Sequence, residues 1–219
     1  MPEATPLELN PRKTADYRVV AAVLRSLSWL LFHPRVTGRA NIPLTGPVII
    51  APSHRSNVDF VFTLFMSPRK VFFMAKDPIF RVPILGPLVR HLGAFPVRRG
   101  SADRESLELS EEILRRGQAL VLFPEGTRKS GLTIEPLHDG AMFVAARTGA
   151  TVVPVGIGGT ERAMPVGKKM IRPAKVRVVI GEPIAPPERD GRVSRSAVTA
   201  KSEELRQKLQ SLYLESLAG

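Results

Sequence analysis

The chain has 219 residues, no cysteine and a formal net charge of +12 at pH 7. This length fits one ordinary domain with a full core, and the lack of cysteine excludes disulfides, thiolate metal ligands and a cysteine nucleophile. The charge predicts an anionic partner, such as nucleic acid, an anionic membrane surface or phosphorylated small molecules. Because only 6% of the residues are aromatic, few side chains can stack on bases, and no nucleic-acid partner is expected.

Residues 14–33 have a helical pattern of apolar side chains that Arg25 interrupts. The uninterrupted apolar stretch is shorter than the ~20 residues that a spanning helix needs. A signal peptide is disfavoured, because Arg25 splits its apolar region and the stretch 37–40 is a poor cleavage site. We expect a helix that lies in the membrane interface, with Trp29 and Phe32 entering the lipid and arginines at headgroup level. An amphipathic helix packed only on the domain's own core stays open as the alternative.

A histidine followed five residues later by an aspartate stands between an apolar run and a second apolar segment. Residues five apart lie about 140° apart around a helix. The side chains of His54 and Asp59 can therefore meet only if His54 precedes the helix and Asp59 lies in its first turn. There the carboxylate accepts from one imidazole nitrogen and leaves the other free to take a proton. A purely structural hydrogen bond is the alternative, because short motifs occur by chance.

The remaining elements alternate between strands and helices, which predicts a single α/β domain with a largely parallel or mixed twisted sheet flanked by helices. Two of the predicted strands end at candidate site residues. The strand of residues 70–76 ends at Lys76, and the strand of residues 119–123 is followed by a turn that contains Glu125, Gly126, Thr127 and Arg128. Ligands of open α/β sheets bind at the carboxyl ends of strands. Further strands are expected at 48–51, 151–157 and, at an edge of the sheet, 176–180, and a strand or loop at 93–100. Helices are expected at 79–92, 101–116, 141–148 and 194–217.

Residues 161–177 form a strongly basic segment with a single acidic residue, Glu161. Such a single-sign cluster beside a candidate membrane helix suggests anionic headgroups, with an ordinary solvated surface as the alternative. Its basic residues are Arg162, Lys168, Lys169, Arg172, Lys175 and Arg177.

The sequence lacks the motifs of serine hydrolases, dinucleotide-binding proteins and zinc enzymes. There is no Gly-x-Ser-x-Gly elbow, and the glycines at 156–159 do not complete a dinucleotide fingerprint. No spacing of histidine and acidic residues supports zinc. We therefore expect no metal and no cofactor.

Four motif blocks in order resemble the glycerol-phosphate acyltransferase family, of the lysophosphatidic acid acyltransferase type. The resemblance runs from about Val36 to Gly181, and a family-like core of residues 36–181 is expected within a domain of residues 34–219. Residues 1–33 would form an arm and the interface helix, and residues 194–217 a packing helix. The blocks are His54-x4-Asp59; Gly93 to Arg99, preceded by Ala75-Lys76; Phe123 to Arg128; and Val152 to Val155.

The resemblance implies that His54 is the general base and that Asp59 orients it. His54 would take the proton of an acceptor hydroxyl that attacks the thioester of an acyl-CoA or acyl-carrier protein. The departures from the family pattern are Ser53, where asparagine is common before the histidine, and Arg98, where an acidic or polar residue is common. Both leave the identity of the acceptor open.

The substrate-binding residues are also implied by the resemblance. Lys76, Arg99 and Arg128 would clamp the acceptor phosphate, with Arg98 as a competitor of Arg99. Glu125 would bind an acceptor hydroxyl, hold Arg128 or fix the turn by an ion pair. Backbone amides near Gly126 are the expected donors to the thioester oxyanion, and Thr127 belongs to the same substrate-binding turn.

The expected reaction acylates 1-acylglycerol 3-phosphate at its sn-2 hydroxyl to give phosphatidate. The expected partners are the lysophospholipid acceptor, the acyl-CoA or acyl-carrier protein donor and an anionic membrane surface. The expected location is the cytoplasmic face of the cell membrane, as a peripheral or monotopic protein. The same chemistry on another acceptor, or a non-catalytic lipid- or nucleic-acid-binding protein, stays open.

Overall fold

The computed structural model describes residues 14–97, 102–168 and 170–218. Seven strands form one sheet in the order β1-β7-β6-β2-β5-β3-β4. Neighbouring strands are parallel except β6 and β7, which are antiparallel. The predicted α/β domain with a mixed sheet is therefore confirmed. The strands are β1 Arg35–Thr37, β2 Val48–Pro52, β3 Val71–Lys76, β4 Ala94–Val97, β5 Ala119–Val121, β6 Thr151–Gly158 and β7 Arg177–Ile180.

Strand β7 is not at the edge of the sheet, so that part of the prediction is wrong. The three-residue strand β1 pairs with it in parallel, from Arg35 opposite Arg177 to Thr37 opposite Val179. A strand this short carries little periodicity, and sequence patterns cannot distinguish it from a loop.

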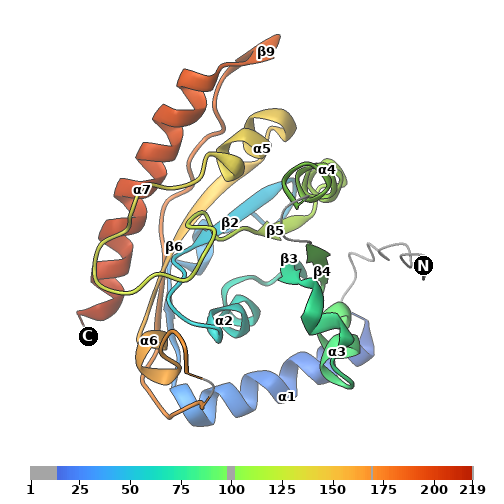
Figure 1. The fold of residues 1–219 in the computed structure, drawn as a ribbon, viewed down its shortest axis with the longest axis vertical. Helices are drawn as coiled ribbons and strands as arrows, with labels where there is room; N and C mark the ends of the chain where they lie inside the picture. The colour runs from blue at the N-terminus through green and yellow to red at the C-terminus, as the bar shows by residue number, and fades with distance from the viewer. Residues whose placement is uncertain (1–13, 98–101, 169, 219) are drawn as a thin grey trace.

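Helices cover both faces of the sheet (Figure 1). The central strand β2 is fully buried, and its side chains alternate between two separate cores, because successive residues of a strand point to opposite faces. Ile50 belongs to the core that contains the buried side chains of α1, α2 and α3, and Ile49 belongs to the core that contains those of α4, α5 and α7. The helices are α1 Ala15–Phe32, α2 Asp59–Met66, α3 Leu85–His91, α4 Ala102–Arg115, α5 Gly140–Thr148, α6 Thr160–Ala163 and α7 Arg195–Leu217, with short 3₁₀ turns η1 Arg39–Asn41 and η2 Asp77–Arg81.

The hairpin of β8 Arg189–Asp190 and β9 Arg192–Val193 precedes α7. Helix α7 then lies directly on β6. A Cβ at Gly156 would lie 2.2 Å from the carbonyl oxygen of Leu212. Only glycine allows such a close approach of helix and strand backbones.

Helix α1 is apolar on two sides. Tyr17, Ala21 and Phe32 are buried against the core, whereas a second apolar stripe, which includes Val23, Leu27 and Leu30, is exposed. The prediction that Phe32 enters the lipid is therefore wrong, because its side chain packs inside the domain. Among the described residues, no helix combines the length and apolarity needed to cross a bilayer.

The predicted placement of arginines at headgroup level is wrong for Arg25. Its Nε donates to the carbonyl oxygen of Leu64 at 2.7 Å, near the C-terminus of α2. The guanidinium therefore faces the domain, where it satisfies a carbonyl group near the end of a helix.

Candidate active site

His54 and Asp59 meet as the spacing predicted. Strand β2 ends at Pro52 and α2 begins at Asp59, so that His54 lies in the intervening turn. The Nδ1 atom of His54 is 2.9 Å from Oδ2 of Asp59. The Asp59 side chain is fully buried, and the His54 side chain keeps 21% of its surface exposed. This arrangement directs the carboxylate at one imidazole nitrogen and leaves the imidazole accessible.

The Asp59 carboxylate also organises the turn itself. Oδ2 accepts from the backbone N–H groups of Arg55, at 2.7 Å, and Ser56, at 2.8 Å. Both residues are buried, and a buried backbone N–H without a partner is costly. Asp59 therefore fixes the turn and the imidazole through one oxygen atom.

The ring of His54 has a second fixed contact. It stacks on the ring of Phe123, with centroids 4.1 Å apart and planes inclined by 30°. Within the described part of the chain, Nε2 of His54 has no hydrogen-bond partner. The stack and the Nδ1 bond hold the imidazole in an orientation that leaves Nε2 available for proton transfer.

Glu125 holds the backbone of His54. Its Oε1 accepts from the His54 N–H at 2.8 Å, and its Oε2 lies 2.6 Å from Nη1 of Arg55. The prediction that Glu125 holds Arg128 is wrong in this structure, because the carboxylate is buried and its ion-pair partner is Arg55. Binding of an acceptor hydroxyl by Glu125 stays a prediction. The third interpretation, an ion pair that fixes the turn, is the one observed.

Arg55 was not among the predicted site residues. Its side chain is 1% exposed, and its Nη2 donates to the carbonyl oxygen of Thr133 at 3.2 Å. The guanidinium lies over the ring of Tyr213 of α7, with Cζ 4.6 Å from the ring centroid. Burial raises the pKa of Tyr213, so its phenol is neutral at neutral pH. An aromatic face is a favourable neighbour for a buried guanidinium.

The turn after β5 is built on Gly126, which has φ +67°. Its N–H donates to the carbonyl of Phe123 at 3.0 Å, and the N–H of Thr127 donates to the carbonyl of Glu125 at 2.7 Å. These two amides are therefore engaged within the turn, which argues against them as the predicted donors to the thioester oxyanion in this conformation. A Cβ at Gly126 would lie 2.7 Å from Cδ2 of His138, so this second histidine, also not predicted, packs on the turn.

The predicted phosphate ligands are only partly brought together. Arg128 is half-buried and, among the described residues, makes no ion pair. Lys76 is exposed at the carboxyl end of β3, at the same edge of the sheet as the turn after β5. Arg98 and Arg99 lie outside the described residues.

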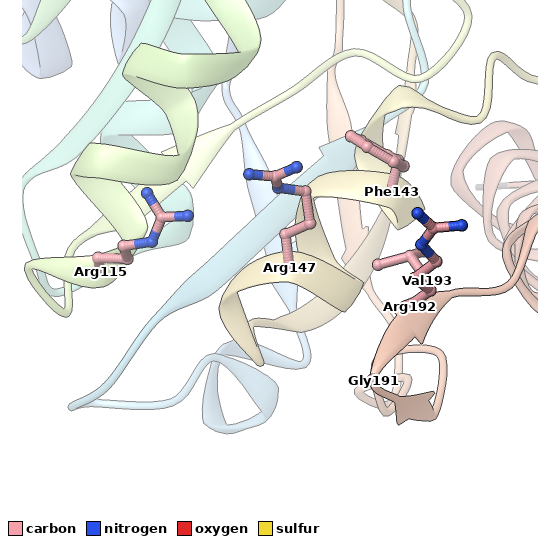
Figure 2. Close-up of a pocket in the computed structure, with 6 residues that line it drawn as sticks. All are labelled: Arg115, Phe143, Arg147, Gly191, Arg192 and Val193. Atoms are coloured by element: carbon pink, nitrogen blue, oxygen red, sulfur yellow. The ribbon is translucent and has the colours of Figure 1, made fainter.

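An arginine-lined cavity of about 390 Å³ lies elsewhere, between α4, α5 and β9 (Figure 2). Arg115 and Arg147 point toward each other, and each forms a 2.6 Å ion pair with the buried carboxylate of Glu111. Both arginines lie in the last turns of helices that lead into the amino ends of β5 and β6, so the cavity is at the opposite edge of the sheet from His54. Ion pairing with Glu111 and the helix dipoles account for these two arginines.

Comparisons with known proteins identify the family of the chain. The family model described as Acyltransferase matches residues 33–158. The 1-acyl-sn-glycerol-3-phosphate acyltransferase of Bacillus subtilis is 29% identical over 90% of this chain and 96% of its own length. The chloroplastic 1-acyl-sn-glycerol-3-phosphate acyltransferase LPAT1 of Arabidopsis thaliana is 31% identical over 81% of this chain, which spans about half (51%) of that relative.

A solved structure shares the fold. The crystal structure of the 1-acyl-sn-glycerophosphate (LPA) acyltransferase PlsC of Thermotoga maritima matches with a TM-score of 0.75 and 27% identity, over 92% of this chain and 80% of that one. The family model covers more than half of the sequence and contains the His54–Asp59 pair and the turn after β5. The chain therefore belongs to the Acyltransferase family.

Proposed function

We propose that the chain transfers a fatty acyl group from acyl-CoA or an acyl-carrier protein to the sn-2 hydroxyl of 1-acylglycerol 3-phosphate, giving phosphatidate. The observation that supports this most is the 2.9 Å contact between His54 Nδ1 and Asp59 Oδ2 beside an unoccupied Nε2. The names of the relatives in Bacillus subtilis and Arabidopsis thaliana support the choice of acceptor. His54 is the general base and Asp59 its orienting carboxylate.

The nearby serines support a direct transfer without an acyl-enzyme. The buried Oγ of Ser53 accepts from the Ile157 N–H at 2.9 Å, and Oγ of Ser56 donates to the Met164 carbonyl at 2.7 Å. Neither hydroxyl is directed at the His54 imidazole, which a protein nucleophile would need. The acceptor's own hydroxyl therefore takes the place of the nucleophilic serine of a triad.

The reaction follows from these positions. Nε2 of His54 takes the hydroxyl proton as the acceptor oxygen bonds to the thioester carbonyl carbon, and the carbon–sulfur bond then breaks. The imidazolium returns the proton to the leaving thiolate, so no net proton is gained or lost by the protein. Asp59 stabilises the imidazolium between the two steps.

The acceptor phosphate is held by Arg128, Lys76 and Arg99. Arg128 supports this assignment because it is half-buried in the turn after β5, and a guanidinium offers paired donors to phosphate oxygens. Thr127, which is exposed in the same turn, lies next to the acceptor, and Gly126 supplies the turn conformation.

The protein works at the cytoplasmic face of the cell membrane, on an anionic surface that α1 contacts. The exposed apolar stripe of α1 supports this, because a helix that only packed on its own domain would turn a polar face to water. The net charge of +12 favours anionic lipid through the surface potential. No cofactor is required, since the thioester carries the energy of the transfer.

The test measures thiol release from long-chain acyl-CoA in anionic micelles, with 1-acylglycerol 3-phosphate, with 1-acylglycerol or with no acceptor. We expect release that depends on the phosphate-bearing acceptor and that falls by about 10³-fold or more in His54→Ala. His33→Asn is the matched control, because asparagine tolerates the φ of +42° at that position.

Equal thiol release with both acceptors would show that the enzyme does not require the phosphate, and the proposed substrate would then have to be another lipid alcohol. Binding of either lipid without turnover, unchanged in His54→Ala, would show a non-catalytic lipid-binding protein instead.

A further inference from the structure

Large apolar side chains that are exposed to water concentrate in three segments of the described chain. All but Leu44, Leu132 and Leu214 lie on α1, in the turn of residues 82–85 or in the loop of residues 166–172. On α1 they are Val19, Val23, Leu27, Trp29, Leu30 and Leu31; in the 82–85 turn Val82, Ile84 and Leu85; and in the 166–172 loop Val166, Met170 and Ile171.

The turn and the loop flank α1 at its two ends. Figure 1 shows α3, which follows the 82–85 turn, beside the start of α1, and α6, which precedes the loop, beside its end. Two contacts fix this placement: His91 Nε2 of α3 lies 3.3 Å from Oδ2 of Asp16, and the N–H of Ala174 donates to the Leu31 carbonyl at 3.2 Å. The three segments lie at the edge of the sheet where β2 and β6 end.

Ile84 is the most exposed of these side chains, at 86%, and it has φ +68°. A β-branched residue rarely adopts this backbone conformation, which is strained. Glycine would relieve the strain, and an isoleucine that faces water gains no stabilising packing inside the domain. The exposure and the strained backbone of Ile84 are both explained if its side chain is buried in a partner outside this chain.

The charges around these apolar side chains favour an anionic partner. The loop exposes Lys168 and Arg172 beside Met170 and Ile171, and the sequence has no acidic residue from 166 to 175. Lys169 lies outside the described residues. Apolar side chains flanked by lysine and arginine suit the boundary between anionic headgroups and acyl chains.

We propose that the 82–85 turn and the 166–172 loop enter the same anionic bilayer leaflet as α1, so that the protein rests on lipid at three points. This inference builds on the membrane contact of α1 proposed above. The loop begins beside Met164, whose carbonyl accepts from Oγ of Ser56 in the His54–Asp59 turn. Three-point contact therefore places that turn close to the headgroups, where a lysophospholipid can reach it without leaving the membrane.

The chain has no cysteine and one tryptophan, which permits a direct test. Ile84→Cys, Met170→Cys and Leu44→Cys each carry one environment-sensitive fluorophore on the otherwise unchanged chain. Leu44 is the matched control, because it is 71% exposed but precedes β2, at the opposite edge of the sheet. Vesicles contain phosphatidylcholine with or without phosphatidylglycerol, and nitroxide-labelled lipid quenches inserted probes. Trp29, 58% exposed on α1, reports the contact of the helix in each variant.

We expect the fluorescence of the probes at 84 and 170 to increase on vesicles that contain phosphatidylglycerol and to be quenched when these vesicles also contain nitroxide-labelled lipid. The probe at 44 should show neither change. A double variant Ile84→Glu/Met170→Glu should bind these vesicles about ten-fold or more weakly, with Leu44→Glu unchanged.

Quenching of Trp29 with no quenching at 84 and 170 would overturn the three-point contact and leave that of α1 intact. No quenching at any position, with no sedimentation on vesicles, would overturn both. Thiol release in detergent micelles, measured on the same variants, separates either result from a failure of the acyl transfer.

Discussion

Arg55 and Glu125 form a buried ion pair, with Nη1 and Oε2 2.6 Å apart and both side chains almost fully shielded from water. The two residues come from the turns after β2 and β5, which are neighbouring strands. Because Glu125 also accepts from the His54 N–H and Arg55 lies over Tyr213, the pair joins the His54 turn to the turn after β5 and to helix α7.

Glu125→Gln is expected to lower the free energy of unfolding by about 3–5 kcal/mol, because it leaves the Arg55 charge buried without a counterion. The amide oxygen of glutamine can still accept from the His54 N–H. Urea unfolding at neutral pH measures the change. Arg55→Met/Glu125→Gln removes the charge as well and should recover part of the loss. Equal stability of the single and double variants would contradict this account.

Tyr213→Leu should lower kcat by about ten-fold, because loss of the ring lets Arg55 and the His54 turn shift. KM for the donor and the acceptor should change little, since Tyr213 is buried in the protein. Tyr213→Phe keeps the aromatic face and should retain nearly full activity. A parallel loss in both variants would point to the phenol oxygen, which lies 3.4 Å from the Gly131 carbonyl, and not to the ring.

Asp59→Asn should reduce kcat/KM by about 10³–10⁴-fold, because an amide cannot stabilise the imidazolium as a carboxylate does. The asparagine oxygen can still accept from the N–H groups of Arg55 and Ser56, so the fold should persist. Steady-state kinetics and circular dichroism together check the prediction. A variant that loses its folded signal would indicate that Asp59 is needed mainly for the turn.

Gly126→Ala should destabilise the turn after β5, since φ is +67° and the new methyl group would collide with the His138 ring. The expected cost is about 1–3 kcal/mol from backbone strain and the contact together. Gly126→Ala/His138→Ala removes the collision but not the strain, so it should recover only part of the stability. Full recovery would show that the backbone tolerates the substitution.

Arg128→Ala should raise KM for 1-acylglycerol 3-phosphate by about ten-fold or more, with kcat and KM for acyl-CoA nearly unchanged, because a phosphate ligand binds substrate and transition state alike. Lys129→Ala is the control, since Lys129 already pairs with Glu135 at 2.5 Å. Equal effects on donor and acceptor would reject Arg128 as the phosphate ligand.

Periodicity and motif spacing were sufficient for much of this structure. The run at 48–51 is apolar at every position, which is typical of a strand buried on both faces, and β2 is that strand. The five-residue spacing of His54 and Asp59 required a turn followed by a helix start, and α2 begins at Asp59. Local geometry decided both features, so sequence reasoning could reach them.

The partners of Glu125 and Tyr213 could not be predicted in the same way. Arg55 is separated from Glu125 by 70 positions, and its charge is typical of a surface residue. Nothing in a helical pattern distinguishes a tyrosine that packs on a core from one that covers a guanidinium. Such contacts depend on the order of strands in the sheet, which single-sequence patterns do not specify.

The position of Tyr213 on the last helix has a consequence for the order in which the protein is made. The ribosome makes the chain from its N-terminus and a domain generally folds as a unit, so His54 leaves the ribosome long before α7 exists. The strand β6, which pairs with β2, also arrives late. A nascent chain, or one truncated before α7, therefore carries His54 and Asp59 without the Tyr213 ring over Arg55, and the contacts around Arg55 are complete only once α7 has been made.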